Sequence, residues 1–225
     1  MVRLLAINTN IEIPNNVLQY FYSFIPEQKI NRLERFRIKQ DKYNSLLGEV
    51  LIRTYISRIY RIPPQDIEIY LSKNNKPYIN NIQNLHFNIS HSNHWVICCI
   101  SHFPIGIDIE EIIPIDFNIA RDFFSENEYL DLMSFKDSEK KLDYFYALWT
   151  LKEAYTKYLG TGITIPLDSF SFSIDDKEIR LNTQDSGPLH FYQSKLTPNY
   201  IFSVCIEESD FDPSPKIYTL TELME

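Results

Sequence analysis

The chain repeats one plan of local features, and this repetition constrains the fold more than any other property of the sequence. Each landmark of the first half has a counterpart 102 to 106 residues later, in the same order. Because short apolar motifs can agree by chance, the constant order and separation carry the argument. The repeated pairs are Pro64-Gln65-Asp66 with Pro166-Leu167-Asp168, Leu85-His86-Phe87 with Leu189-His190-Phe191, and the apolar runs 95–100 and 200–206.

Two long amphipathic segments, 43–60 and 144–159, fit the same plan as helices. A shift of 104 residues aligns Glu153 with Glu49 and Lys157 with Arg53, so that each helix carries an acid and a base one turn apart. We interpret Glu49 and Arg53 as a surface pair. The sequence therefore predicts an α+β fold of two similar halves, residues 1–104 and 105–225, related by a pseudo-twofold axis with a site at their interface.

The remaining elements follow from apolar spacing. Strands are predicted at 1–7, 66–71, 85–89, 95–100, 106–110, 169–174 and 200–206, and helices at 15–24 and from residue 26 onward. The helix over 43–60 is expected to bury the stripe Leu46, Leu47, Val50, Leu51, Tyr55 and Ile59.

Charge and composition exclude several classes of protein. The net charge of −8 argues against a general nucleic-acid binder. No apolar run has the length of a membrane span, and the brief apolar start predicts a first strand and not a signal peptide. The three cysteines lie in apolar runs without metal-ligand spacing, so we expect free thiols in a cytoplasmic protein. The segment 28–61 has nine basic and three acidic residues, which indicates a solvated helical face or a local anion site.

Three acids and a lysine are candidates for a metal site. Asp108 and Glu110 alternate with apolar residues on a predicted strand, which places both on one face. Glu153 and Lys157 share one face of the second long helix, with Trp149 one turn earlier. Oxygen ligands of this kind suit Mg²⁺, which commonly acts on substrate phosphates. The alternative is an exposed strand face and a surface ion pair.

A second candidate is the segment Ser90-His91-Ser92, which follows a predicted strand. Two hydroxyl groups, an imidazole and turn N–H groups could hold a phosphate, although a simple loop histidine is the other interpretation. The chain has five glycines and no Gly-rich phosphate loop or nucleophile elbow.

The combination of these motifs resembles the 4′-phosphopantetheinyl transferases, in particular their Sfp-type branch. The similarity rests on Ile105-Gly106-Ile107-Asp108-Ile109-Glu110 and on Trp149-Thr150-Leu151-Lys152-Glu153-Ala154-Tyr155-Thr156-Lys157. It extends to Phe87-Asn88-Ile89-Ser90-His91-Ser92, Lys76-Pro77, Phe123-Phe124-Ser125 and Pro166-Leu167-Asp168-Ser169-Phe170. Asn75 stands where relatives often have Gly, and Asn tolerates the left-handed backbone such a turn needs.

This resemblance implies that the chain moves the phosphopantetheine arm of coenzyme A to a serine of an apo acyl or peptidyl carrier protein and releases 3′,5′-ADP. It implies Mg²⁺ ligands at Asp108, Glu110 and Glu153, and a pyrophosphate contact at Lys157. Glu153 is our candidate for the base that activates the serine, and Glu128 is a weaker second. Coenzyme A binding is implied for Lys29, Arg32, Lys76, Pro77, Ser90, His91 and Lys157.

The resemblance further implies a cytoplasmic monomer without membrane or nucleic-acid partners, which activates carrier proteins of pathways such as antibiotic synthesis. For carrier docking we expect the apolar segment Ile112-Ile113-Pro114-Ile115 with Phe117, if it is not core. Two other functions stay open, a Mg²⁺-dependent nucleotide pyrophosphate hydrolase and a coenzyme A-binding module without enzymatic activity.

Overall fold

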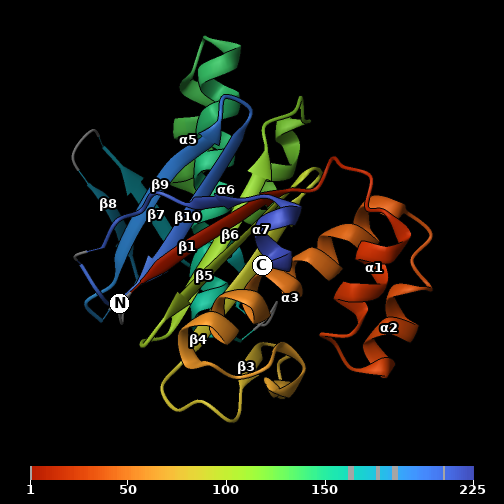
Figure 1. Ribbon diagram of the computed structural model, residues 1–225. Helices are drawn as coiled ribbons and strands as arrows, with labels where there is room; N and C mark the ends of the chain where they lie inside the picture. Colours follow the sequence, from red (N-terminus) through yellow and green to blue (C-terminus); the bar gives the residue numbers. More distant parts are fainter. Residues whose placement is uncertain (1, 162–164, 176–177, 184–186, 210) are drawn as a thin grey trace.

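Two sheets of mainly antiparallel strands, each covered by one long helix, form the body of the protein in the computed structural model (Figure 1). The structure describes residues 2–161, 165–175, 178–183, 187–209 and 211–225. In the first half, β1 (Arg3–Asn8), β5 (Trp95–Ser101) and β4 (His86–Ser92) pair in that order. In the second half, β6 (Ile105–Glu111), β10 (Tyr200–Ile206) and β9 (His190–Thr197) repeat it. The predicted α+β fold of two similar halves is confirmed.

The two long helices have equal length, α3 at Lys39–Tyr60 and α6 at Ser138–Leu159. Each ends on a residue in the left-handed conformation, Arg61 in the first half and Gly160 in the second. A two-stranded ribbon completes each half, β2 (Ile69–Leu71) with β3 (Pro77–Ile79), and β7 (Ser171–Ile174) with β8 (Ile179–Asn182). The other helices are α1 (Asn15–Tyr22), α2 (Glu27–Leu33), α4 (Ala120–Phe123), α5 (Glu126–Ser134) and α7 (Leu220–Met224).

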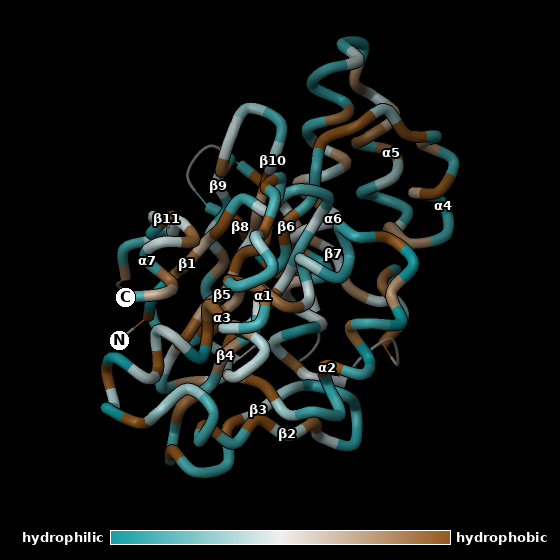
Figure 2. The backbone as a smooth tube through the Cα atoms, turned by 45° about the vertical axis from the view of Figure 1, so that its right-hand side comes forward, coloured by the Kyte–Doolittle hydropathy of each residue, from teal (hydrophilic) through white to brown (hydrophobic). Residues whose placement is uncertain are grey.

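Hydrophobic contacts arrange these elements in four layers. One core lies between α3 and the first sheet, a second surrounds α6, and a third joins the two sheets face to face. The central strands β5 and β10 are buried at every position, which explains their continuous apolar runs. Figure 2 shows hydrophobic stretches of the backbone tube in these central strands and hydrophilic ones in the outer loops.

The long helices correspond at a separation of 99 residues, so the predicted alignment at 104 was wrong. The contacts of one buried cation in each half show which residues of the two helices correspond. The Arg53 guanidinium donates to the carbonyl oxygens of Pro64 and Ile67, both at 2.7 Å. In the second half, the Lys152 ammonium donates to those of Leu167 and Phe170, also at 2.7 Å. Arg53 is therefore the counterpart of Lys152 and not of Lys157.

Both buried cations have a buried acid as partner, so the interpretation of Glu49 and Arg53 as a surface pair was also wrong. Arg53 Nε lies 2.8 Å from Glu49 Oε1, and both side chains are almost fully buried. Lys152 Nζ lies 2.8 Å from Glu128 Oε2. The other Glu128 oxygen, Oε1, accepts a 2.8 Å hydrogen bond from the Phe172 N–H. Glu128 is thus fully engaged inside the second half, which removes the physical basis for a role as catalytic base.

Replacing Lys152 with methionine is expected to lower the free energy of unfolding by about 3–5 kcal/mol, because Glu128 would stay buried without its charge partner. Urea unfolding of wild type and variant measures this difference. Lys140→Met on the same helix is the matched control, because Lys140 is exposed. Equal losses of stability for the two variants would contradict the interpretation.

The two sheets also meet edge to edge, through side chains of β4 and backbone groups of β6. The Ile107 N–H donates to Asn88 Oδ1 at 3.0 Å, and the Ile109 N–H donates to Ser90 Oγ at 3.3 Å. The Glu111 N–H donates to Ser92 Oγ at 3.0 Å. Alternate side chains of β4 therefore accept hydrogen bonds from alternate backbone amides of β6. In a continuous sheet, backbone carbonyl oxygens of the neighbouring strand would accept these bonds. We call this contact the β4–β6 joint.

The last part of the chain returns to the first half. β11 (Lys216–Tyr218) pairs in parallel with β1, and Tyr218 lies opposite Ile7. Tyr218 and Leu223 of the following helix α7 are buried in the core beside α3. The first sheet is consequently completed by residues from the far end of the chain.

Several local predictions needed correction. β2 begins at Ile69 because a short 3₁₀ helix occupies Pro64–Asp66, and Ile59 at the end of α3 is 59% exposed. Ser90, His91 and Ser92 lie within β4, so they do not form the predicted phosphate-binding turn. The turn follows them, and Asn93 there has a positive φ of 41°.

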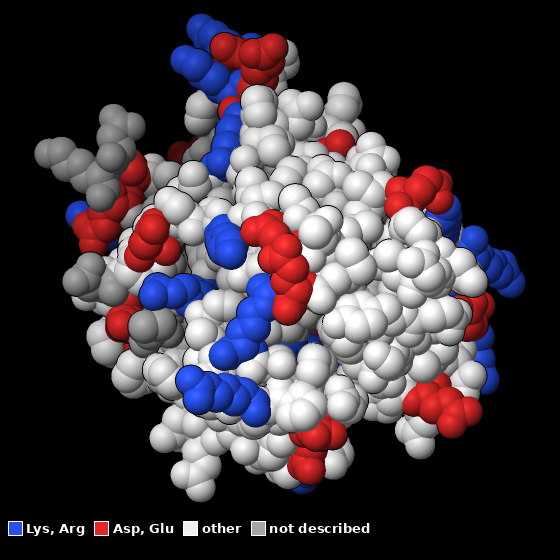
Figure 3. Space-filling model, in the orientation of Figure 1, with Lys and Arg blue, Asp and Glu red and all other residues white. Residues whose placement is uncertain are grey.

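Four of the nine basic residues in the segment 28–61 pair with acids, Arg53 with Glu49 as described above and three lysines as follows. Lys29 contacts Glu49, Lys39 contacts Glu12, and Lys42 contacts Glu34. Figure 3 shows Lys and Arg interspersed with Asp and Glu on the face in view, separated by wide uncharged areas. Among the described residues, no helix combines the length and the hydrophobicity that a membrane crossing requires.

Candidate active site

Strand β6 directs two acids toward helix α6. Its odd-numbered isoleucines, Ile105, Ile107 and Ile109, are buried in the core between the sheets. Gly106, Asp108 and Glu110 therefore lie on the opposite face, as the alternating sequence predicted. Gly106 is in such close contact with α6 that a Cβ atom there would lie 2.0 Å from the Ala154 carbonyl oxygen.

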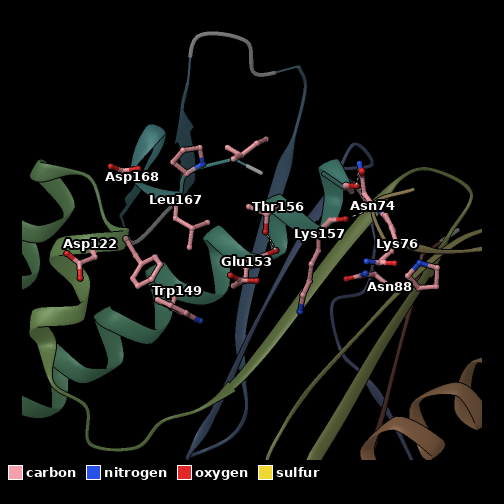
Figure 4. A pocket seen from close by; sticks show the side chains of 16 residues that line it. Asn74, Lys76, Asn88, Asp122, Trp149, Glu153, Thr156, Lys157, Leu167 and Asp168 are labelled. Atoms are coloured by element: carbon pink, nitrogen blue, oxygen red, sulfur yellow. Dashed lines mark hydrogen bonds between the residues drawn. The ribbon is translucent and has the colours of Figure 1, made fainter. Parts of the chain in front are cut away.

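Helix α6 places Trp149, Glu153 and Lys157 on the face toward β6, at successive one-turn intervals. All three line the same cavity, and Figure 4 shows Glu153 and Lys157 projecting from α6 beside the Trp149 ring. The indole is stacked on Phe145, with ring centroids 5.8 Å apart and an interplanar angle of 20°. Trp149 therefore forms part of the cavity wall.

Asp108 is the centre of the polar contacts. Its Oδ1 atom accepts hydrogen bonds from Lys157 Nζ at 2.6 Å and from Ser90 Oγ at 2.8 Å. Its Oδ2 atom is buried and makes no hydrogen bond with any described residue. Because a buried carboxylate oxygen without a partner is energetically costly, this atom indicates a missing cation or donor.

The neighbouring acids repel one another. Burial is the main cause that raises the pKa of Glu110 to about 7, and the charge of Asp108 adds to it. Burial, followed by the charge of Asp108, also raises the pKa of Glu153 above its usual value. Converging carboxylates with raised pKa values favour a bound cation, which would neutralise them.

The donor set fits a hard divalent cation, because the three acids supply only oxygen atoms. Within the described ranges, no three His, Cys, Asp or Glu side chains have the arrangement of a preformed metal site. In this structure the Lys157 ammonium is the positive partner of Asp108. Because Lys157 pairs with Oδ1, the Oδ2 atom of Asp108 is the oxygen that a metal ion could contact without displacing Lys157.

Two cavities meet at this cluster. The larger, of about 820 Å³, extends from the turn Asn74–Pro77 along α6 to Phe123 and Leu167. The smaller, of about 320 Å³, contains Ser90, His91, Asp108 and Glu110. Trp149, Glu153 and Lys157 line both, so a long ligand could occupy both cavities and present its middle to the acids.

Lys76 lines the larger cavity, but its ammonium group is engaged in hydrogen bonds that connect the first half to helix α6. Lys76 Nζ donates to the carbonyl oxygens of Lys157 at 2.7 Å and Tyr158 at 2.9 Å, at the C-terminal end of α6. A longer bond of 3.4 Å reaches the Ile105 carbonyl oxygen. Asn74 Nδ2 adds a hydrogen bond to the Gly160 carbonyl oxygen. The turn with Asn75 at φ 61° thus fastens the first half to the helix of the second.

Some of the residues predicted to bind coenzyme A line the two cavities, and others do not. Pro77, Lys76, Ser90, His91 and Lys157 line one or both cavities. Lys29 and Arg32 lie on α2 and are absent from both linings, and the Lys29 ammonium pairs with Glu49.

Ser92 was predicted only as part of a phosphate-binding segment, but its hydroxyl donates to Glu110 Oε2 at 2.8 Å. The alternation of Asn88, Ser90 and Ser92 along one strand was the signal that could have identified it.

Comparisons with known proteins agree with this geometry. Residues 14–102 match the family model described as 4′-phosphopantetheinyl transferase, N-terminal, and residues 104–205 match the 4′-phosphopantetheinyl transferase superfamily. The chain is 41% identical over 206 residues to 4′-phosphopantetheinyl transferase Sfp of Bacillus subtilis (strain 168), which covers 91% of this chain and 92% of the relative. It is 37% identical over 206 residues to 4′-phosphopantetheinyl transferase gsp of Aneurinibacillus migulanus, covering 91% of this chain and 86% of that protein.

A more distant human relative is L-aminoadipate-semialdehyde dehydrogenase-phosphopantetheinyl transferase, 28% identical over 212 residues, with 84% of this chain and 68% of that protein covered. These matches cover both halves of the fold and define a class of transferases. The chain belongs to the 4′-phosphopantetheinyl transferase family, in the branch that contains Sfp.

Proposed function

We propose that the protein transfers the 4′-phosphopantetheine arm of coenzyme A to a serine of an apo acyl or peptidyl carrier protein, with release of 3′,5′-ADP. The observation that carries this proposal is the position of Asp108, Glu110, Glu153 and Lys157 where the two cavities meet. Coenzyme A has a charged nucleotide and a long, less polar arm joined by a pyrophosphate. The polar smaller cavity suits the phosphates. In the larger cavity, the end at Lys76 and Pro77 suits the base of the nucleotide, and the end at Phe123 and Leu167 suits the arm.

We propose that Asp108, Glu110 and Glu153 together hold Mg²⁺, whose charge would offset that of the pyrophosphate and of the leaving phosphate. Lys157 would add positive charge at the same place. The buried, unpartnered Oδ2 of Asp108 supports this assignment. Ser90 and Lys157 both hold Asp108 Oδ1, so Oδ2 is the oxygen available to a cation.

Glu153 is the proposed base for the incoming serine. Glu153 lines both cavities, so its carboxylate lies where the serine hydroxyl and the pyrophosphate would meet. The serine oxygen would form a bond to the phosphorus that carries pantetheine, and the bond from that phosphorus to 3′,5′-ADP would break. The hydroxyl proton would pass to Glu153.

Lys76 and Pro77 are proposed to form the wall beside the nucleotide. Because the Lys76 ammonium already donates to the end of α6, we propose that it acts mainly through the position of that helix. Lys29 and Arg32 remain proposed contacts for the nucleotide phosphates, and they would have to approach the smaller cavity when the ligand binds.

One assay tests the reaction against its alternatives. The purified protein is incubated with coenzyme A, Mg²⁺ and an apo carrier protein, and the carrier is measured by intact-mass spectrometry. The proposal predicts a phosphopantetheine-sized mass increase on the carrier. Release of 3′,5′-ADP without a carrier would indicate a nucleotide pyrophosphate hydrolase instead. Coenzyme A that binds without reacting would indicate a binding module.

We further propose that the carrier docks on the segment 112–117. Ile113 in this segment is 50% exposed, whereas Ile112, Ile115 and Phe117 pack partly against the core around α6. Ile113→Asp is expected to raise the KM for the carrier about tenfold, or about 1.4 kcal/mol, with unchanged coenzyme A binding. Ile59→Asp is the matched control because Ile59 is similarly exposed in the first half. An unchanged KM for Ile113→Asp would exclude this docking surface.

The remaining assignments are also proposals. We place the boundary between the halves at residues 104 and 105, supported by the adjoining family-model matches and by the start of β6 at Ile105. We expect the protein to act as a cytoplasmic monomer in carrier-protein activation for pathways such as antibiotic synthesis.

A further inference from the structure

The β4–β6 joint does more than connect two sheets, because its serines also contact the acids of the candidate site. Ser90 Oγ lies 2.8 Å from Asp108 Oδ1, and Ser92 Oγ lies 2.8 Å from Glu110 Oε2. Both pairs are separated by 18 residues in the sequence. The register of the joint therefore assigns one serine to each of the two strand acids.

The direction of each hydrogen bond at Ser92 follows from its partners. The Glu111 N–H can only donate, and it lies 3.0 Å from Ser92 Oγ. The single hydroxyl proton of Ser92 is then directed to Glu110, whose carboxylate can only accept when ionised. The backbone of β6 thus fixes the orientation of the hydroxyl, and the hydroxyl fixes one oxygen of Glu110.

Glu110 needs such a contact more than Asp108 does. Asp108 is held from two sides, by Ser90 and by the Lys157 ammonium. For Glu110, the contact with Ser92 is the one hydrogen bond reported for its carboxylate among the described residues. A glutamate has one more rotatable bond than an aspartate, and repulsion from Asp108 would turn a free Glu110 side chain away from the site.

We propose that Ser92 is a positioning residue, which holds Glu110 beside Asp108 in the orientation that binds a divalent cation. This inference rests on the proposed metal role of Asp108, Glu110 and Glu153. Groups that orient metal ligands commonly change metal affinity about 10- to 100-fold when they are removed.

Direct binding of Mn²⁺, followed by electron paramagnetic resonance of the free ion, tests this role without relying on activity. The full-length protein is compared with Ser92→Ala, which removes the hydroxyl, and with Ser92→Thr, which keeps it. Asn93→Gly is the matched control: Asn93 Nδ2 bonds Glu111 Oε2 at the same joint, and glycine tolerates the positive φ of this position. Glu110→Gln serves as a reference for loss of a proposed ligand.

For Ser92→Ala we expect the Kd for Mn²⁺ to rise about tenfold, whereas Ser92→Thr and Asn93→Gly should stay within about twofold of wild type. Thermal unfolding should show similar midpoints for Ser92→Ala and Asn93→Gly, which separates metal binding from a general loss of structure.

Two results would overturn the inference while leaving the proposed metal site intact. One is a Mn²⁺ affinity of Ser92→Ala equal to that of wild type, with Glu110→Gln weakened. The other is equal weakening in Ser92→Ala and Asn93→Gly. A wild-type protein that binds no Mn²⁺, alone or with coenzyme A, would overturn both the metal site and the role of Ser92.

Discussion

Replacing Asp108 with asparagine is expected to lower the rate of phosphopantetheine transfer by at least about 100-fold, the scale of losing one preorganised electrostatic contact at a reacting centre. The amide keeps the shape of the side chain but removes the negative charge that faces Lys157 at 2.6 Å. It also removes the unpartnered, buried Oδ2 that we assign to the cation. The mass assay with excess Mg²⁺ measures the rate.

The control for this prediction is Asp143→Asn. Asp143 lies on α6 and pairs with Lys195 at the surface, so its loss changes the same charge without touching the site. Relief of repulsion among the three acids and loss of the pair with Lys157 act in opposite directions on the stability of Asp108→Asn, so its unfolding temperature is measured beside its rate. Transfer at the wild-type rate would exclude Asp108 as a metal ligand.

Replacing Gly106 with alanine is expected to affect both stability and activity. The added Cβ would lie 2.0 Å from the Ala154 carbonyl oxygen and 2.4 Å from the Tyr158 nitrogen, which are backbone atoms of α6. The helix must therefore move away from β6. A displacement of about 1 Å in the reacting groups can cost about 100-fold in rate, and overpacking itself costs about 1–3 kcal/mol.

Gly187→Ala is the matched control, because a Cβ at this exposed position would have no atom within 4 Å. Urea unfolding and the transfer assay, applied to both variants, measure the two effects. If Gly106→Ala kept wild-type stability and rate, the close contact between β6 and α6 would not set the geometry of the site.

The sequence predicted the site better than it predicted the relation between the halves. Alternation along β6 and the one-turn spacing on α6 directly fix which side chains share a face, so Asp108, Glu110, Glu153 and Lys157 were found. The helix alignment failed because an acid and a base one turn apart can be matched at more than one register. The second half also has more residues between its long helix and the following 3₁₀ helix, so the two 3₁₀ helices are 103 residues apart, whereas the long helices are 99 residues apart.

Buried charges were the other source of error. Glutamate, arginine and lysine usually lie at the surface, so the sequence did not indicate that these charges are buried. Only the packing shows that Glu49 is enclosed with Arg53 and Glu128 with Lys152. Likewise, hydroxyl residues next to a histidine are typical of turns. That Ser90 and Ser92 continue a strand depends on the neighbouring strand β6, which offers them backbone amides.

The pairing of β11 with β1 has a consequence for protein synthesis. Ile7 leaves the ribosome 211 residues before Tyr218, the residue opposite it in the finished sheet. At about 5–20 residues per second, β1 waits roughly 10–40 s for this neighbour. During that time one edge of β1 is open to other chains, a known route to aggregation. The nascent chain should therefore benefit from chaperones until β11 has emerged, even though both long helices are already complete.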